Sequence, residues 1–408
     1  MKIAQINIVP NGSTGKIMLQ IAHCARSHGY SARTFSPIIF DKYEPKITIT
    51  EEGHFGFGSY AGNKIHAYLG IITGGNGLFS FKGTRDLIMQ LEMYKPDIVH
   101  LHNLHKFCIN LPMLFNYLKT HDVKVVWTLH DCWAFTGHCP YFTMVGCDKW
   151  KNGCHNCTQI GIYPKSLIDN SKIMYQLKKK WFNNVKNMTI VTPSVWLSEL
   201  VKQSFLGNYP IKVINNGIDL TVFKPVKSNF REKYGISEKK NIILGVSFGW
   251  GRRKGLDVFL KLAEVLDDDK YQIVLVGTSD VIDAQLSKNI ISIHKTNDQQ
   301  ELAEIYSAAD LFVNPTREEN YPTVNMEAIA CGTPVVTFNT GGSPEILDEN
   351  SGIVVECDDI DSLICAINHI CKDKLFSEQS CVEKSKSFNA DLCFEKYVEL
   401  YSLISEKE

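Results

Sequence analysis

Long apolar runs, internal repeats, low-complexity segments and an excess of either charge are all missing from this 408-residue sequence. Lysine and arginine number 43 against 44 aspartates and glutamates, so no overall positive field would attract nucleic acid. No stretch approaches the roughly 20 apolar residues of a membrane-spanning helix. Asn7 and Pro10 interrupt the apolar start, which does not resemble a secretory signal. We therefore expect a cytoplasmic protein that does not bind nucleic acid.

Short runs rich in valine and isoleucine alternate with helical patterns along the chain. This order is typical of βαβ units around a parallel sheet. The expected strands are residues 2–9, 97–102, 123–129 and 188–192, followed by 241–246, 271–276, 290–293, 310–313, 334–338 and 352–355. The expected helices are 14–27, 110–119, 171–184, 194–204, 256–266, 299–308, 322–330 and 390–404.

A turn-rich stretch at residues 215–219 separates the two series of strands. The pattern therefore predicts an α/β protein with two doubly wound domains. We expect the first domain at residues 1–206, with a cysteine-rich loop at 138–158. The second domain is expected at 207–387, followed by a C-terminal helix at 388–408.

The most informative segment of the sequence is residues 316–347. A loop at the end of an expected strand carries Glu319, and the helix after it carries Glu327. The first amides of that helix, at Thr323 and Val324, have no intrahelical acceptor and can bind phosphate. Ligands of open α/β sheets bind at this carboxyl edge. Arg252, Arg253 and Lys254 end another strand, where two cations can neutralise a departing diphosphate.

These residues form the Glu-x7-Glu and Gly-Gly-x-x-Glu motifs of a known family. With Asn216-Gly217-Ile218-Asp219, they make the chain resemble the retaining GT-B glycosyltransferases of family 4, glycosyl transferases group 1. The resemblance implies two Rossmann-like domains that face a central cleft, with the C-terminal helix crossing back to the first. It further implies that residues 207–387 bind the donor and residues 1–206 the acceptor.

The resemblance also assigns roles to single residues. Glu327 would hold the donor ribose, Glu319 would face the donor sugar, and Lys254 with Arg253 would clamp the diphosphate. The remaining implied donor contacts are Thr323, Val324, Asn320, Tyr321 and Lys295. One departure is visible, because the family usually has an arginine where this chain has Phe248-Gly249, and Arg253 substitutes for it.

In the first domain, residues 11–16 form a glycine-rich turn after the first strand. Its spacing fits neither a dinucleotide fingerprint nor a Walker loop, so an ordinary strand–helix turn is the alternative to a phosphate loop. The family resemblance assigns Gly15 to the donor diphosphate and His130 to the donor sugar. His100, His102 and His105 cluster in HLHNLH. A polar strand end is favoured there over a metal site, because no carboxylate or cysteine accompanies them.

Cys139, Cys147, Cys154 and Cys157 lie within one short segment. In a reducing compartment, four nearby thiolates favour a structural tetrahedral zinc site. Unpaired thiols and disulfides are the alternatives, and His138 and His155 are possible replacement ligands.

The resemblance implies transfer of a sugar from a nucleotide-sugar co-substrate, UDP- or GDP-linked, without a catalytic metal. The subgroup resembled builds bacterial capsule, colanic acid or O-antigen, so the expected acceptor is a glycan or a polyprenyl-diphosphate-linked oligosaccharide. Peripheral contact with the inner membrane is expected, with helix residues 175–182 as the candidate surface. A catalytically silent sugar-nucleotide-binding partner and a GT-B epimerase are the alternatives.

Overall fold

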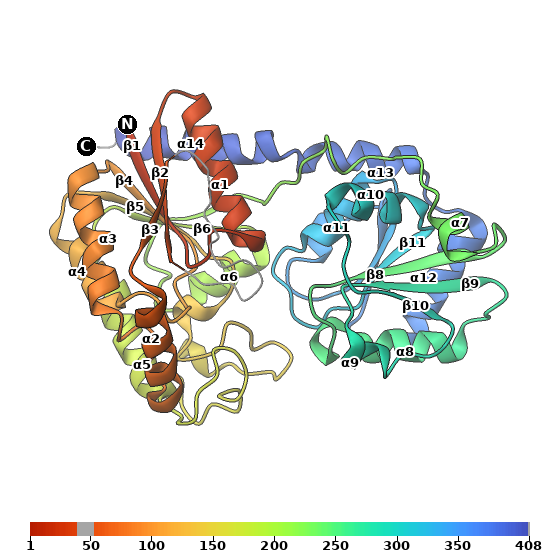
Figure 1. Cartoon of the computed structure of the whole chain (residues 1–408), viewed down its shortest axis with the longest axis horizontal. Coiled ribbons are helices and arrows are strands. Elements are labelled where there is room, and N and C mark those ends of the chain that lie inside the picture. Colours follow the sequence, from red (N-terminus) through yellow and green to blue (C-terminus); the bar gives the residue numbers. More distant parts are fainter. Residues whose placement is uncertain (39–52, 407–408) are drawn as a thin grey trace. The chain divides into compact units, whose positions relative to one another are not determined.

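Each half of the chain folds around its own parallel sheet in a computed structural model that describes residues 1–38 and 53–406 (Figure 1). Two units result: Met1–Asn215 with Cys393–Glu408, and Asn216–Leu392. All strand pairs in the described residues are parallel. The predicted α/β architecture with two Rossmann-like sheets is therefore confirmed.

The first unit holds a seven-stranded sheet in the order β3-β2-β1-β4-β5-β6-β7. Its strands are β1 (Lys2–Ile6), β2 (Ser31–Pro37), β3 (His54–Phe57), β4 (Ile98–Leu101), β5 (Lys124–Thr128), β6 (Met188–Thr192) and β7 (Ile211–Val213). Its helices are α1 (Gly12–Ser27), α2 (Tyr60–Thr73), α3 (Phe81–Tyr94), α4 (Leu111–Thr120), α5 (Ser171–Phe182), α6 (Val195–Gln203) and most of α14 (Ala390–Glu406).

The second unit holds a six-stranded sheet in the order β10-β9-β8-β11-β12-β13. Its strands are β8 (Asn241–Val246), β9 (Tyr271–Val276), β10 (Ile290–Ile293), β11 (Leu311–Asn314), β12 (Val335–Phe338) and β13 (Gly352–Val355). Its helices are α7 (Phe230–Tyr234), α8 (Leu256–Val265), α9 (Asp280–Asp283), α10 (Gln299–Ala308), α11 (Thr323–Ala330), α12 (Ile360–Asp373) and α13 (Glu378–Ser385).

Both faces of the second sheet are buried, which explains the continuous apolar runs of its strands. Successive residues of a strand point to opposite faces. Ile242 and Leu244 of β8 pack with α10 and α11, whereas Ile243 packs with α8 and α12. Figure 1 shows α10 and α11 on one side of this sheet and α8 on the other.

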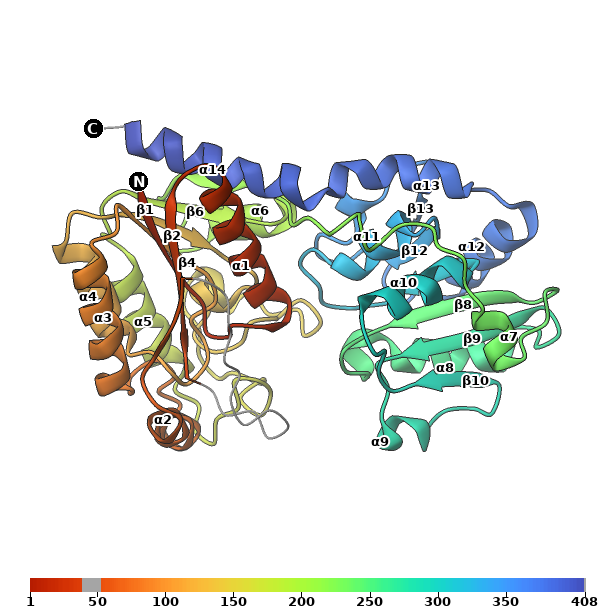
Figure 2. The same ribbon diagram turned by 45° about the horizontal axis from the view of Figure 1, so that its top comes forward.

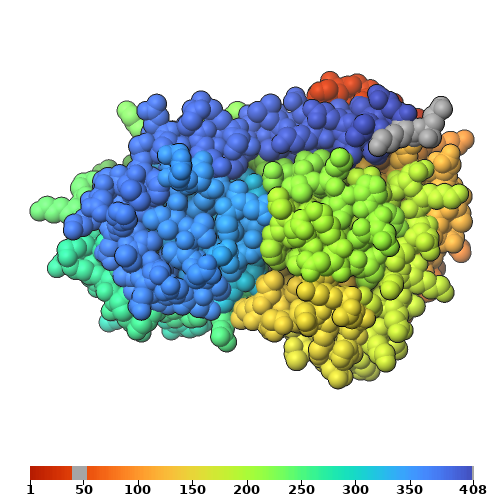
Figure 3. All heavy atoms as spheres, turned by 180° about the vertical axis from the view of Figure 1, so that it is seen from behind, coloured from red at the N-terminus to blue at the C-terminus, as the bar shows by residue number. Residues whose placement is uncertain are grey.

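Helix α14 completes the first unit (Figure 2). The hydroxyl of Tyr401 lies 2.6 Å from His100 Nδ1 in β4, and that of Tyr397 lies 3.2 Å from Thr128 Oγ1 in β5. Both tyrosines are buried. Figure 3 shows the same helix, in blue, running across the surface of this unit. The C-terminal helix thus returns to the first sheet, as the family resemblance implies.

The predicted boundary at residue 206 is too early. Strand β7 pairs with β6, with Ile211 beside Ile190, so the first unit continues to Asn215. The prediction missed β7 because it is a three-residue edge strand with no fully buried residue, and such a strand leaves little apolar signal. The second unit likewise ends at Leu392 rather than 387.

The surface proposed at residues 175–182 for membrane contact does not exist as such. In α5 the side chains of Tyr175, Lys178 and Phe182 are buried. The exposed residues of that helix include Lys179 and Lys180, which form an ordinary solvated face. None of the helices in residues 1–38 and 53–406 has both the length and the apolar character that crossing a membrane requires.

Candidate active site

The second sheet reverses its strand order between β8 and β11, which lie side by side. Ligands of open α/β sheets bind at such a switch point, beyond the carboxyl ends of the strands. Strand β8 leads here into a short 3-10 turn, Arg252–Lys254. Strand β11 leads into the loop that carries Glu319 and then into α11. Residues 65 positions apart in the sequence therefore meet at one point.

The central contact of the site is an ion pair between the ammonium group of Lys254 and the carboxylate of Glu319. Their side chains are only 24% and 18% exposed. Burial alone would raise the pKa of Glu319, but the charges of Lys254 and Arg253 hold it below the usual range. Glu319 is therefore ionised at neutral pH, and Lys254 has a fixed partner that a more strongly anionic ligand could displace.

Arg317 holds the two strand ends together beneath this ion pair. Its guanidinium pairs with Asp257 at 2.8 Å and with Asp358 at 2.6 Å, and it also donates to the carbonyl of Arg252. The side chain is only 8% exposed, so its bidentate geometry is strongly constrained. Arg253 donates to the carbonyl of Glu318 at 3.2 Å, which ties the 3-10 turn directly to the loop.

The Gly-Gly-x-x-Glu motif supports the Glu319 loop from the side of β12. Gly342 N–H donates to the carbonyl of Asn320 at 2.8 Å. Gly341 has φ +57°, and a Cβ atom there would lie 1.7 Å from the carbonyl oxygen of Glu319. Only glycine allows this backbone approach, so the motif has a structural reason at Gly341.

The start of α11 supplies backbone donors beside the ion pair. Pro322 is its N-cap and offers no side-chain oxygen to the first turn. Within the described residues, the amides of Thr323 and Val324 donate no hydrogen bond. Two such donors, with the helix dipole behind them, favour an anion. Asn320 and Tyr321, just before the helix, are both buried.

Glu327 lies in the second turn of α11, half-buried. The hydroxyl of Tyr306, in α10, donates to its carboxylate oxygen at 3.2 Å. Tyr306 is fully buried, and burial, followed by the charge of Glu327, raises its pKa well above the usual value. The hydroxyl therefore stays protonated and fixes the carboxylate, a role that the sequence patterns do not reveal.

Lys295 stands apart from this group. It follows β10, which β9 separates from β8, and its side chain is exposed. Next to it, Asp280, Asp283 and His294 form a group whose ligand atoms lie within 4.8 Å of one another. It is the one such group of three or more His, Cys, Asp or Glu residues in the described parts of the chain. All three of its side chains are exposed.

In the first unit, Gly15 lies in α1 against the turn that precedes it. A Cβ atom at this position would be 2.6 Å from the carbonyl carbon of Pro10 and 3.0 Å from the oxygen of Val9. The buried Asn7 fixes the same turn by donating to Val9 O at 3.0 Å and contacting Thr14 Oγ1 at 3.1 Å. Close packing alone therefore requires glycine at residue 15.

His130 follows β5 and is the end of a row of histidines. Its Nε2 lies 3.1 Å from Nδ1 of the buried His102, and the two rings stack with centroids 5.5 Å apart. The amide of Gln5 is satisfied when its nitrogen donates to Met18 O and to His102 Nε2, and its oxygen accepts from Ala22 N–H.

This orientation determines where the protons lie. His102 accepts at Nε2, so it carries its proton on Nδ1 and donates it to His130 Nε2. Burial lowers the pKa of His130 to about 4, against the opposing charge of Asp131. A neutral His130 that accepts at Nε2 carries its proton on Nδ1.

His100 and His105 have structural partners. His100 lies between Tyr401 and Thr128, at 2.6 and 2.8 Å. His105 Nε2 lies 2.8 Å from Asp131 Oδ2, and its Nδ1 lies 2.9 Å from the hydroxyl of Tyr163. The three histidines therefore form buried hydrogen bonds, and the carboxylate of Asp131 accompanies His105, contrary to the sequence-based expectation that no carboxylate does.

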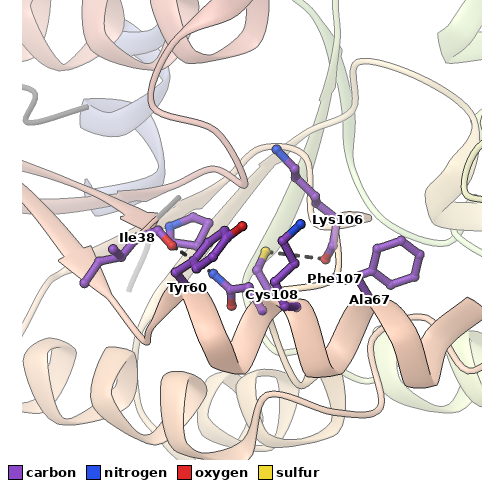
Figure 4. Close-up of a pocket in the computed structure, with 9 residues that line it drawn as sticks. Ile38, Tyr60, Ala67, Lys106, Phe107 and Cys108 are labelled. Carbon is purple, nitrogen blue, oxygen red and sulfur yellow. Dashed lines mark hydrogen bonds between the residues drawn. The ribbon is translucent and has the colours of Figure 1, made fainter. Parts of the chain in front are cut away.

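A hollow of about 250 Å³ opens at the same carboxyl edge of the first sheet (Figure 4). Its walls come from the segments after β2 and β4 and from α2, and are mostly apolar. Its lining residues are Pro37, Ile38, Tyr60, Asn63, Lys64, Ala67, Lys106, Phe107 and Cys108. It therefore combines apolar surface with two ammonium groups, a feature that no sequence pattern indicated.

Comparison with known proteins places this geometry in a family. Residues 226–388 match the family described as Glycosyl transferases group 1, and residues 51–222 match Glycosyltransferase Family 4. The putative colanic acid biosynthesis glycosyl transferase WcaC of Escherichia coli K12 is 26% identical over 282 residues, 66% of each chain. The match thus spans just under two thirds of that relative.

A second relative, an Escherichia coli UDP-Gal:alpha-D-GlcNAc-diphosphoundecaprenol alpha-1,3-galactosyltransferase, is 27% identical over 221 residues, 49% of this chain and 56% of its own. Among solved structures, sucrose-phosphate synthase from Thermosynechococcus elongatus superposes over the full length of both chains with a TM-score of 0.74 at 18% identity. Anabaena HepE in complex with UDP gives 0.67 at 16% identity, over 98% of this chain and all of its own. With both halves matched and two Rossmann-like sheets, the chain belongs to the GT-B glycosyltransferases of family 4, group 1.

Proposed function

We propose that the protein is a retaining glycosyltransferase that moves a sugar from a nucleoside-diphosphate donor to a lipid-linked glycan in bacterial surface polysaccharide synthesis. The Lys254–Glu319 ion pair at the switch point, beside the unpaired amides of α11, carries this proposal. Cations and oriented amides stabilise charge that develops on a departing diphosphate. UDP-bound HepE and the UDP-Gal-dependent relative favour a UDP-linked donor, with GDP as the alternative.

The donor's parts would be held by different residues. Lys254, Arg253 and the amides of Thr323 and Val324 would bind the diphosphate. The carboxylate of Glu327, which Tyr306 orients, would bind the ribose. Glu319 would then exchange its partner, since Lys254 turns to the phosphate and the carboxylate becomes available to a sugar hydroxyl. In the first unit, His130, just after the end of β5, remains the candidate for contact with a sugar.

The anomeric configuration is retained because the acceptor hydroxyl attacks the anomeric carbon on the same face from which the diphosphate leaves. The bond from the anomeric carbon to the phosphate oxygen breaks, the new glycosidic bond forms, and the acceptor proton passes to that phosphate oxygen. No side chain is required as a covalent nucleophile. The chain's residues hold and orient the donor and neutralise the charge that develops on its diphosphate. Charge stabilisation of this kind is commonly the largest contribution to rate.

A thermal-shift panel of UDP-, GDP-, ADP- and dTDP-sugars tests the donor site. A ligand at 100 times its Kd stabilises the folded state by about 2.7 kcal/mol. We expect one nucleotide class to raise Tm in the wild type, and Lys254→Met and Glu327→Gln to abolish the shift. Lys261→Met is the matched control, because Lys261 is an exposed lysine of α8 paired only with Glu264. No shift with any nucleotide would favour a silent partner.

Product analysis then separates transfer from epimerisation. With donor and a polyprenyl-diphosphate-linked acceptor, we expect a glycosylated lipid whose new linkage keeps the donor's anomeric configuration by NMR. Release of an epimerised sugar or nucleotide sugar without transfer would favour the epimerase, and an inverted linkage would refute retention.

The hollow in the first unit is the proposed acceptor site. Its apolar walls fit the first isoprenoid units of a polyprenyl chain, and Lys64 and Lys106 fit the diphosphate. Tyr60, Ile65 and Tyr68 are exposed along α2 and provide apolar contact with a membrane surface. Lys64→Met combined with Lys106→Met should raise KM for the lipid acceptor and leave the donor thermal shift unchanged. Lys82→Met, at an exposed lysine of α3, is the control.

A further inference from the structure

The segment from residue 129 to 170, between β5 and α5, has little regular structure. It contains two single-turn 3-10 helices, Trp133–Phe135 and Lys149–Lys151, and it is the yellow bulge on the first unit in Figure 3. A few aromatic side chains pack within it: Phe142 stacks on Trp150 at 5.1 Å between ring centroids. A region with so small a core usually needs a covalent or metal cross-link to remain ordered.

Four thiols of this segment gather around Cys139. The Cys139 thiol is hydrogen-bonded to that of Cys157 and interacts electrostatically with Cys154 and Cys147. All four are free cysteines, and Cys139 is buried. No three of their sulfur atoms lie within 4.8 Å of one another, so the thiols are grouped but not drawn together.

Backbone N–H groups are already directed at two of these sulfur atoms. Gly137 N–H donates to Cys154 Sγ at 3.1 Å, and a backbone hydrogen bond joins Gln159 to the Cys157 sulfur. A Cβ atom at Gly137 would lie 2.7 Å from Cys154 Cβ, so glycine permits the approach. Hydrogen bonds of this kind stabilise a thiolate over a thiol and orient the ligands of a metal.

A buried ammonium group next to the thiols is the second, independent observation. Lys178 of α5 is 1% exposed. It donates to the carbonyls of Trp133 and Thr136 at 2.8 and 3.0 Å and lies 3.4 Å from the centroid of the Trp133 ring. No carboxylate among the described residues forms an ion pair with it.

The charges that can compensate Lys178 are those of the cysteines. Besides Asp131, which is already paired with His105, the groups that interact with its charge are Cys154 and Cys139. A buried charge without a partner is costly. Burial lowers the pKa of Lys178 to about 7, so next to neutral thiols it carries only part of its charge at neutral pH. Thiolates bound to a metal would favour its ammonium form.

We propose that Cys139, Cys147, Cys154 and Cys157 bind one structural Zn²⁺ ion as a four-thiolate site. Binding replaces four S–H bonds by four Zn–S bonds of about 2.3 Å and releases four protons to solvent. The resulting site carries a charge of −2, of which Lys178 balances one unit. The ion draws the sulfur atoms inward and cross-links the segment that follows His130.

Metal content of the intact, untagged protein purified from zinc-supplemented cells tests this site. We expect about one zinc per chain by mass spectrometry of the metal, and loss of most of it in Cys157→Ser. Cys365→Ser removes an exposed cysteine outside the segment and should keep the zinc. Asp283→Asn, in the group formed with Asp280 and His294, should also keep it.

A second measurement uses only wild-type protein, so it tests the site even if a cysteine variant fails to fold. Titration of wild-type protein with a thiol-specific mercurial should release about one zinc per chain. After the mercurial is removed with excess thiol, re-added metal should bind with release of protons. Cobalt exchanged into the site should show the visible absorption of tetrahedral thiolate coordination. A metal-free wild type, a mass two hydrogens lower from a Cys139–Cys157 disulfide, or zinc lost only in Asp283→Asn would each overturn the proposal.

Discussion

Replacing the buried His66 with glutamine measures how much of the pH dependence of the first unit's stability comes from this one histidine. His66 lies in α2 and is fully buried. Its Nε2 accepts from Gly77 N–H at 3.2 Å, and its Nδ1 lies 2.7 Å from Ser80 Oγ. Both ring nitrogens are thus used by the neutral imidazole, and burial lowers the pKa to about 4 from an ordinary value of 6.5.

The sign and size of the effect follow from proton linkage. Above pH 6.5 the imidazole of His66 is neutral in both the folded and the unfolded chain. As pH falls from 6.5 toward 4, His66 binds a proton in the unfolded chain but not in the folded chain, so the free energy of unfolding falls. Between pH 7 and pH 5 this single group accounts for about 2 kcal/mol of lost stability.

Urea unfolding at pH 7 and pH 5, followed by tryptophan fluorescence, gives this difference. The probe reports mainly on the first unit, since Trp250 is the one tryptophan of the sequence outside residues 1–215. The pH-dependent loss of stability should be about 2 kcal/mol smaller in His66→Gln than in wild type. His121→Gln, at an exposed histidine, is the control. Equal losses in wild type and His66→Gln would refute the assignment of a buried neutral imidazole.

Three further changes test the donor half of the site. Tyr306→Phe removes the hydroxyl that orients Glu327 and keeps the ring packing, so donor KM should rise by the equivalent of about 1 kcal/mol with little change in kcat; unchanged steady-state kinetics would contradict the role. Gly341→Ala should disrupt the Glu319 loop and abolish donor binding in the thermal-shift assay, whereas Gly235→Ala, at φ +63° with open space around it, should cost only about 1 kcal/mol of stability. Arg317→Met breaks two partly buried ion pairs and should lower the free energy of unfolding of the second unit by about 3 kcal/mol, measured by urea titration; a loss below 1 kcal/mol would mean that Asp257 and Asp358 are not held.

The buried strands of both sheets could be predicted because they are covered on both faces and form continuous apolar runs. Strand β8 was predicted at its observed bounds for this reason. Strands β2, β3 and β7 escaped prediction. Strand β2 carries the polar alternation of SARTFSP, and β3 and β7 are short edge strands that are mostly not fully buried. Burial of Lys178 in α5 also escaped prediction, because a run of three lysines gives no sign that only the first of them faces inward.

The residues of the candidate site likewise divide into those that the sequence predicts and those that it does not. Glu319, Glu327 and Lys254 were identifiable because they lie at strand ends and helix starts with a family spacing. Tyr306 and Arg317 were not, since Tyr306 contacts Glu327 from a different helix and Arg317 acts through Asp257 and Asp358, 60 and 41 positions away. No local pattern marks a residue that orients another. The orientation of Gln5, which determines the tautomer of His130, is likewise visible only in three dimensions.

The return of α14 to the first sheet has a consequence for how the chain folds during synthesis. His100 and Thr128 are made early, but their partners Tyr401 and Tyr397 are translated only after the whole of residues 216–392. Until those residues emerge, the first unit has an uncovered sheet face with unsatisfied polar groups, while the whole of the second unit, Asn216–Leu392, is already available. The later half of the chain can therefore reach its native structure first, and a fragment that ends at Asn215 is expected to be aggregation-prone.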